Sequence, residues 1–171
     1  RAIVCTVVVF AVPAVPGRLP AGLTEASVVA IVPARYHSSR LPGKPLADID
    51  GRPMVEHVYR RAARAAVDAV IVATDDQRIV EAVERFGGIA WLTRADHLTG
   101  TDRLAEIAAT LPCDVIINVQ GDEPFIDPAA IDLLAAPLVH DRAVEMTTLC
   151  RPFLPGEDVQ SPHLVKVVRD L

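Results

Sequence analysis

The sequence predicts an α/β protein with a three-layer, mostly parallel, Rossmann-like sheet. Apolar, β-branched runs recur along the chain, with the clearest at 28–32, 68–74 and 114–119. Segments with helical periodicity separate these runs, and polar motifs follow them. Because ligands of open α/β sheets bind beyond the carboxyl ends of the strands, these polar motifs form the candidate site.

The first half of the predicted sheet is connected by two helices. Pro53 suits the first position of a helix whose apolar face continues to Ala62. Asp75 or Asp76 is expected to cap a second helix, which runs through Phe86 and stops at the glycine pair that follows. The two adjacent acids are therefore interpreted as helix caps in preference to an acidic ligand pair.

The second half continues the same alternation. Residues 89–92 are predicted as a short strand, and Thr101 or Asp102 as the cap of the next helix. Asp127-Pro128 has the cap and first-residue chemistry of another helix, and 144–149 is predicted as a fifth strand. Strands that alternate with helices in this way favour parallel pairing.

Composition excludes several classes of protein. The 171 residues are 51% hydrophobic and 23% charged, which fits one globular domain with a buried core. A net charge of -5 argues against a nucleic-acid-coating surface, and an aromatic content of 4% argues against base-stacking platforms. Cys5, Cys113 and Cys150 are widely spaced, so we expect buried free thiols and neither disulfides nor a zinc site.

A basic loop follows the first buried run. Pro33 is expected to end that strand, and the loop carries cations and hydroxyl donors at Arg35, Ser38, Ser39, Arg40 and Lys44. Such a set suits a polyphosphate, because Arg grips phosphate oxygens in pairs and Lys adds a compact charge. The alternative is a solvated basic surface loop. Neither the Walker phosphate loop nor the dinucleotide-binding glycine fingerprint is present in the sequence.

Asp122 is the predicted metal carboxylate. It follows a buried strand in a glycine-containing turn, and Mg²⁺ in nucleotidyl-transfer sites is held by one or two carboxylates together with substrate phosphates. A turn aspartate that bonds its own backbone is the competing reading. Gln120 can read a sugar hydroxyl or a base edge, or it can satisfy the core.

Arg94 and Thr101 lie in a loop that leads into a helix, where hydroxyls and backbone N–H groups gather. Asp96, His97 and Arg103 can equally hold this loop together through ion pairs. His97 as a general base is the less favoured reading.

Four motifs in order carry a specific resemblance: PARYHSSRLPGKPL at 33–46, VATDD at 72–76, TRADHLTGTDRLAE at 93–106 and NVQGDEP at 118–124. Residues 28–170 resemble the 3-deoxy-manno-octulosonate cytidylyltransferase (CMP-KDO synthetase) family. The resemblance implies a sheet of the nucleotide-sugar nucleotidyltransferase type. It also implies a family region beyond Leu171 with much of the sugar-acid pocket, the dimer contacts and a second metal carboxylate.

The resemblance implies transfer of CMP from CTP to 3-deoxy-D-manno-octulosonate (KDO), with release of pyrophosphate, for lipopolysaccharide biosynthesis. It further implies Mg²⁺ as cofactor, a cytoplasmic location, a homodimeric full-length protein, and neither nucleic-acid nor membrane partners. The residues expected to bind substrate or act in catalysis are Arg35, Ser38, Arg40, Lys44, Arg94, Thr101, Gln120 and Asp122. Of these, Arg35, Lys44 and Asp122 are the expected catalytic set, and Asp122 the metal ligand.

Residues 1–27 do not match the family. They contain a Pro-interrupted apolar run that is too short for a membrane span. We expect a leader outside the fold, either an upstream extension or a mis-called start, in preference to a targeting segment. The domain is then 28–171, incomplete at its C-terminus.

Two other functions remain open. The chain could be a CTP-binding module that is inactive without its missing part, or a cytidylyltransferase for another sugar acid, such as sialic acid. A dehydrogenase is the weakest alternative, because the glycine fingerprint is absent.

Overall fold

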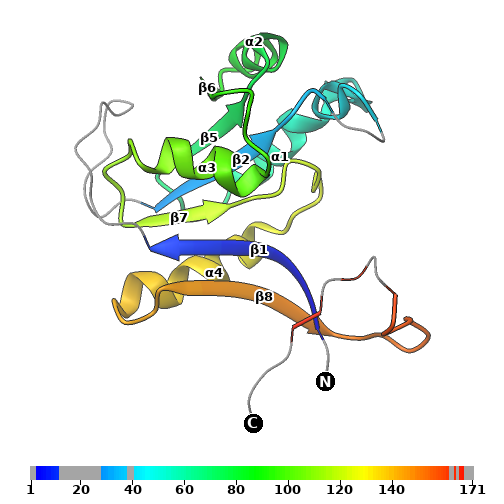
Figure 1. The fold of residues 1–171 in the computed structure, drawn as a ribbon, viewed down its shortest axis with the longest axis vertical. Coiled ribbons are helices and arrows are strands. Elements are labelled where there is room, and N and C mark those ends of the chain that lie inside the picture. Colours follow the sequence, from blue (N-terminus) through cyan, green and yellow to red (C-terminus); the bar gives the residue numbers. More distant parts are fainter. Residues whose placement is uncertain (1–2, 12–27, 38–40, 162–163, 165, 168–171) are drawn as a thin grey trace.

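The computed structural model describes residues 3–11, 28–37, 41–161, 164 and 166–167. A six-stranded sheet runs through the molecule in the order β6-β5-β2-β7-β1-β8, with helices on both faces (Figure 1). Its strands are β1 (Ile3–Ala11), β2 (Val28–Ala34), β5 (Ala69–Thr74), β6 (Ile89–Leu92), β7 (Val115–Asn118) and β8 (Met146–Pro152). The helices are η1 (Lys44–Leu46), α1 (Met54–Ala62), α2 (Gln77–Arg85), α3 (Gly100–Ala108) and α4 (Pro128–His140). A small hairpin of β3 (Asp48–Ile49) and β4 (Arg52–Pro53) precedes α1.

The sheet is mostly parallel, which confirms the predicted fold class. β2 pairs in parallel with β5 on one side and with β7 on the other, and β5 pairs in parallel with β6. β1 is antiparallel to both β7 and β8. The carboxyl ends of β2, β5 and β7 therefore lie along one edge, where the polar motifs follow.

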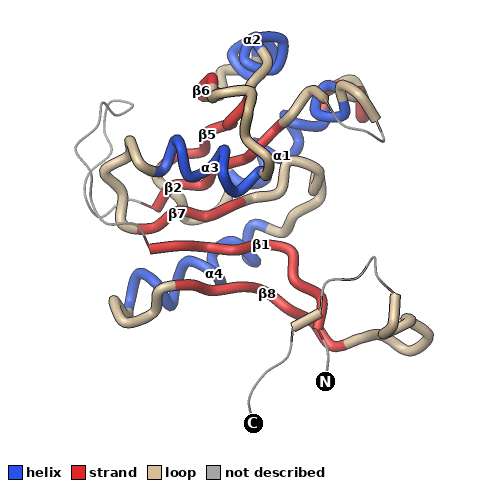
Figure 2. The backbone as a smooth tube through the Cα atoms, in the orientation of Figure 1, coloured by secondary structure: helices blue, strands red, loops and turns tan. Residues whose placement is uncertain are grey.

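The two faces of β2 belong to two separate cores. Val28, Ala30 and Val32 are buried in one core, together with apolar residues of α1, α2 and α4. Val29 and Ile31 point the other way and pack with residues of α3 in a second core. This alternation makes the sheet the middle of three layers, as Figure 2 shows with helices on both sides of the strands.

Capping and turn residues in the sequence predicted the ends of most helices and strands to within a few residues. Asp76 caps α2 and Asp127 caps α4, as expected. α3 is different, because Thr99 is its cap and Asp102 is its third residue, so that each side chain bonds the backbone of the other. The predicted cap at Thr101 or Asp102 was wrong, since it missed this reciprocal pair.

Two strand boundaries also differ from the prediction. Pro33 does not end β2, which continues to Ala34 with pairing to β5 alone. Pairing with β7 stops at Ile31, so the missing N–H of Pro33 leaves no gap in that ladder. The last strand, β8, lies later than the predicted 144–149 and has exposed residues at both ends.

Part of the expected leader is built into the sheet. Residues 1–27 were expected to stand outside the fold, but Ile3–Ala11 forms β1 between β7 and β8. The segment is rich in β-branched residues, which favour extended structure. Its backbone pairs with the edge of β7 on one side and the edge of β8 on the other, so neither of these edges is left without a partner strand. Residues 12–27 lie outside the described part of the chain.

Two further expectations concern membranes and thiols. Within the described ranges, no helix is long and apolar enough to cross a bilayer. Cys113 and Cys150 are free, and burial raises the pKa of the Cys113 thiol to about 11. Cys150 is exposed on β8, so the prediction of a buried thiol was wrong at that position.

The turn after β7 passes very close to the end of β2. A Cβ atom added at Gly121 would lie 2.4 Å from the carbonyl oxygen of Pro33, a distance that side-chain carbons do not adopt. Gly121 is therefore needed for space. Its small size lets the NVQGDEP turn approach β2, which leads into the basic loop that carries Arg35 and Lys44, here called the phosphate loop.

We predict that Gly121→Ala lowers the free energy of unfolding by about 1–3 kcal/mol, because the backbone must move apart to admit the methyl group. Urea denaturation followed by circular dichroism measures this change. The matched control is Gly100→Ala, whose Cβ would meet Pro33 side-chain atoms at an ordinary 3.5 Å. Equal stability of the two variants would contradict the close approach.

Candidate active site

One pocket of about 200 Å³ lies beyond the carboxyl ends of β2 and β7. It collects residues from the phosphate loop, from α1 and α3, and from the turn after β7. Its lining residues are Pro33, Ala34, Arg35, Lys44, Pro45, Met54, Gly100, Gln120, Gly121 and Asp122. Four of the predicted site residues are therefore together: Arg35, Lys44, Gln120 and Asp122.

Lys44 is positioned by a tight turn in the phosphate loop. Gly43 adopts a left-handed conformation with φ of 70°, which a side chain would disfavour. Its N–H donates to the carbonyl oxygen of Tyr36 at 2.7 Å, which closes the loop between them. Lys44 then begins the short helix η1, with Pro45 buried behind it. The turn thus places Lys44 near the carboxyl end of β2, which Arg35 directly follows.

Lys44 and Asp122 are in direct contact. The Nζ atom of Lys44 donates to Oδ2 of Asp122 at 2.7 Å, and the two side chains are 37% and 53% exposed. Because both groups remain open to solvent, the pair contributes little to stability, typically about 0–1 kcal/mol. The contact is more informative about the site, since it places a cation directly on the predicted metal carboxylate.

Arg35 presents an unused donor in the same place. Its Nη2 atom is buried and has no hydrogen-bond partner among the described residues, although Arg35 as a whole is only half-buried. A buried guanidinium nitrogen without an acceptor is costly. Arg35 also lines the pocket, where its guanidinium group and the ammonium group of Lys44 are the cations that a bound anion would meet.

Asp122 is followed by a second carboxylate with different properties. Glu123 lies at an adjoining pocket that Asp122 also lines. Burial, and then the nearby charge of Asp122, raise the pKa of the Glu123 carboxyl. Asp122 is thus the more solvent-accessible acid and the better placed of the two to meet a cation.

Two other predicted site residues, Arg94 and Thr101, do not line this pocket. Arg94 forms an ion pair with Asp96 at 3.1 Å, where both side chains are largely exposed, and it does not line the pocket. Thr101 is exposed in the first turn of α3, one residue beyond the pocket-lining Gly100. Ser38 and Arg40 lie outside the described residues. The roles expected for these four residues stay predictions.

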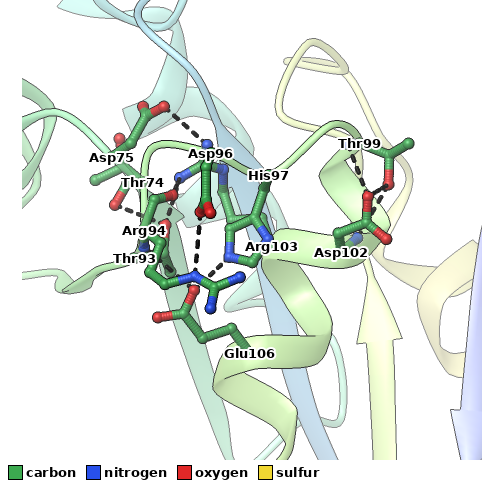
Figure 3. A network of polar contacts seen from close by, with 10 residues as sticks. All are labelled: Thr74, Asp75, Thr93, Arg94, Asp96, His97, Thr99, Asp102, Arg103 and Glu106. Atoms are coloured by element: carbon green, nitrogen blue, oxygen red, sulfur yellow. Dashed lines mark hydrogen bonds and ion pairs between the residues drawn. The ribbon is translucent and has the colours of Figure 1, made fainter.

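The loop before α3 is held by a buried arginine (Figure 3). Arg103 is fully buried and donates to Asp75 at 2.8 Å, to the Thr93 hydroxyl, and to the Arg94 carbonyl oxygen at 3.3 Å. These contacts connect α3, the end of β5 and the segment after β6. The ion-pair reading of this loop is therefore the one that the geometry supports for Arg103.

His97 belongs to the same network. Its ring bonds the carboxylate of Glu106 on α3, and this contact is the main reason that the pKa of Glu106 is lowered (Figure 3). The side chain of His97 is only 8% exposed and does not line the pocket. This arrangement fits a loop brace and leaves the general-base reading without geometric support.

Sequence reasoning missed several contributors to the site. Pro33, Pro45 and Met54 line the pocket, yet each reads as an ordinary strand, turn or helix residue in the sequence. Gly100 carried a weak signal, because a glycine at a helix start permits close approach. Tyr36 lies in the motif at 33–46, but nothing in the sequence indicated its contact with Arg78.

Asp122 is the carboxylate in this pocket that could hold a metal ion. Among the described residues, no group of three or more His, Cys, Asp and Glu side chains gathers. A hard cation at Asp122 would therefore take most of its ligands from substrate phosphates and water, which suits Mg²⁺. The ammonium group of Lys44, 2.7 Å from Asp122, shows that the position already accepts a positive charge.

Relatives of known name share most of this chain. A protein from Geobacter metallireducens named 3-deoxy-manno-octulosonate cytidylyltransferase is 57% identical over 144 residues, which are 84% of this chain and 57% of the relative. The protein of the same name from Syntrophotalea carbinolica is 54% identical over 145 residues, 84% of this chain and 58% of the relative. The chain thus spans a little over half the length of the curated relatives it matches.

Solved structures agree with this relationship. A CMP:2-keto-3-deoxy-manno-octonic acid synthetase complexed with CTP is 52% identical, with a TM-score of 0.68 over 70% of this chain and 50% of that chain. A nucleotidyl transferase from Methanothermobacter thermautotroptrophicus, at 22% identity and a TM-score of 0.57, shares the fold. The cytidylyltransferase family model matches residues 29–171. The chain therefore belongs to the cytidylyltransferase family.

Proposed function

We propose that this chain carries the nucleotide-binding part of an enzyme that transfers CMP from CTP to KDO, with release of pyrophosphate. The observation that carries the proposal is the convergence of Arg35, Lys44, Gln120 and Asp122 on one pocket. It is supported by 52% identity to a synthetase solved with CTP, and by 54–57% identity to relatives named for this reaction.

Arg35 and Lys44 would bind the triphosphate. Arg35 lines the pocket, and a guanidinium group can donate two parallel hydrogen bonds to phosphate oxygens. Lys44 would leave Asp122 for a phosphate, because an exposed pair at 2.7 Å is weak enough to exchange. Both cations would then contact the phosphate groups, which carry the negative charge of CTP.

Asp122 would hold the divalent cation, which we propose to be Mg²⁺. When bound, the ion neutralises charge on the transferred phosphate and on the departing pyrophosphate. Asp122 is free for this role once Lys44 has moved. The neighbouring Glu123 carboxyl is less exposed than Asp122, and its pKa is raised by burial and then by the charge of Asp122.

The reaction itself asks for little covalent work from the protein. The anomeric 2-hydroxyl oxygen of KDO would lose its proton to solvent and form a bond to the α-phosphorus as the bond to pyrophosphate breaks on the opposite side. Arg35 and Lys44 hold the phosphate chain in line and counter its charge. Gln120 offers donors and an acceptor for a sugar hydroxyl or base edge, and Arg94 and Thr101 remain candidates for the nucleoside end.

A second function, CTP binding without turnover, is favoured by one observation. The chain covers 57–58% of its curated relatives, so residues that complete the sugar-acid site can lie in the part that is not shared. A related sugar acid such as sialic acid is the other alternative acceptor. The homodimer, the cytoplasmic location and the absence of nucleic-acid and membrane partners stay predictions.

We expect this chain to bind CTP in the presence of Mg²⁺, and isothermal titration calorimetry measures the affinity. Pyrophosphate release after addition of KDO separates the two functions, with sialic acid as the comparison substrate. Release with KDO alone supports the synthetase, and binding without release supports the module. A chain that binds no CTP would overturn both.

We predict opposite effects of Lys44→Ala on two ligands. CTP binding weakens by about tenfold, the size of one lost charged contact. Binding of Mn²⁺ alone becomes stronger, because Asp122 no longer has an ammonium group in contact with it. Electron paramagnetic resonance of free Mn²⁺ measures the second effect without any turnover. Unchanged Mn²⁺ binding would contradict the proposed exchange.

Asp122→Ala is the companion variant. It should weaken Mn²⁺ binding in the presence of CTP and leave the fold intact, because its side chain is half exposed. In a complete enzyme, we expect both variants to slow pyrophosphate release by roughly a hundredfold or more. Arg142→Ala is the charge-matched control for Lys44→Ala, since Arg142 is 94% exposed and does not line the pocket. Near-normal turnover in both Lys44→Ala and Asp122→Ala would refute the two assignments.

A further inference from the structure

Tyr36, a residue of the phosphate loop, contacts helix α2 through Arg78. The guanidinium carbon of Arg78 lies over the Tyr36 ring, 3.4 Å from its centroid. The same ring is close to Gly43, where an added Cβ atom would be 3.2 Å from a ring carbon. Neither Tyr36 nor Arg78 lines the pocket. The Tyr36–Arg78 contact therefore joins the phosphate loop to α2 without lining the pocket.

Arg78 is held in one orientation by Asp76. The Nε and Nη2 atoms of Arg78 donate to the two carboxylate oxygens of Asp76 at 2.9 and 2.6 Å. This pair lowers the pKa of Asp76, mainly through the side-chain hydrogen bond, and raises the pKa of Arg78. A two-pronged contact fixes the plane of the guanidinium group, which is the plane that faces the tyrosine.

Helix stability does not explain the position of Arg78. It is the second residue of α2, and a positive charge in the first turn opposes the helix dipole. Asp76, which caps the helix, would do so without an arginine. The contact that Arg78 adds is the one to Tyr36.

Tyr36 and Gly43 fix the base of the phosphate loop. The carbonyl oxygen of Tyr36 accepts from the N–H of Gly43 at 2.7 Å, so the two ends of the segment 36–43 are joined. Arg35 directly precedes this junction and Lys44 directly follows it. Any shift of the Tyr36 ring would therefore be passed to both pocket cations.

We propose that the Asp76–Arg78–Tyr36 stack is a positioning device that sets the spacing of Arg35 and Lys44 for a triphosphate. The inference rests on the proposed function, because it assigns the phosphates to these two cations. Asp76, Arg78 and Tyr36 act through the loop and touch no substrate. Loss of the stack should therefore weaken ligands in proportion to the phosphates they carry.

The test compares CTP with CMP, by calorimetry on this chain and its variants. Arg78→Gln should weaken CTP binding by roughly two- to fivefold, the range of a cation–π contact at an exposed site, and CMP binding by much less. Arg85→Gln is the matched control: it makes the same charge change on the same helix, and Arg85 is exposed and has no recorded partner in the described part of the chain. Tyr36→Phe keeps the ring and should bind like the wild type, whereas Tyr36→Leu should behave like Arg78→Gln.

Each outcome of these binding measurements either supports or contradicts the proposed positioning role. A selective loss of CTP binding in Arg78→Gln and Tyr36→Leu, rescued in Tyr36→Phe, supports the device. Equal losses for CTP and CMP, or a lower melting temperature with an unchanged CTP-to-CMP ratio, would show a purely structural role and overturn it. Arg78→Lys keeps the charge and covers the case in which Arg78→Gln does not fold; wild-type selectivity in that variant counts against the device. A wild-type chain that binds no CTP would instead remove the proposed function itself.

Discussion

The close approach of two backbone segments underlies the whole site. The turn after β7 can reach the end of β2 only because Gly121 has no side chain to collide with the carbonyl oxygen of Pro33. Gln120 and Asp122 lie on either side of this glycine, and Arg35 lies two residues beyond Pro33. The contact thus brings a carboxylate and an amide from one strand to the cations of another. Without it, the same residues would follow separate strands without sharing a pocket.

The Lys44–Asp122 ion pair in this pocket can exchange its partners for a ligand, and it adds little to the stability of the fold. The Lys44–Asp122 pair is well aligned but exposed, so it neutralises the two groups at little gain in folding free energy. Arg103 is the opposite case, because it is fully buried and bonds Asp75, Thr93 and a backbone carbonyl. Removing one partner of such a buried pair typically costs about 3–5 kcal/mol. The protein therefore keeps its permanent ion pair behind the loop and its exchangeable pair in the pocket.

Helices brace the site from outside the pocket. α3 carries Arg103 and Glu106, which hold the loop before it through Thr93 and His97. α2 carries Arg78, which lies over Tyr36 behind the phosphate loop. In both cases a long cationic side chain on a helix reaches a residue of a loop beside that helix. The loops that face the ligand are thus held by side chains that do not face it.

The sequence by itself determined the features that depend on neighbouring residues. Apolar β-branched runs marked the strands of the parallel sheet, and Asp127-Pro128 and Asp76 marked helix starts, because capping acts over three or four residues. The motifs also pointed to the family through residues such as Lys44 and Asp122. Only the tertiary structure decided which of these side chains meet, since each meeting joins segments far apart in the chain. It paired Asp75 with Arg103, placed Arg78 over Tyr36, and set Ile3–Ala11 between β7 and β8. Such contacts depend on which strands lie next to each other in the sheet, and a pattern of neighbouring residues does not determine that order.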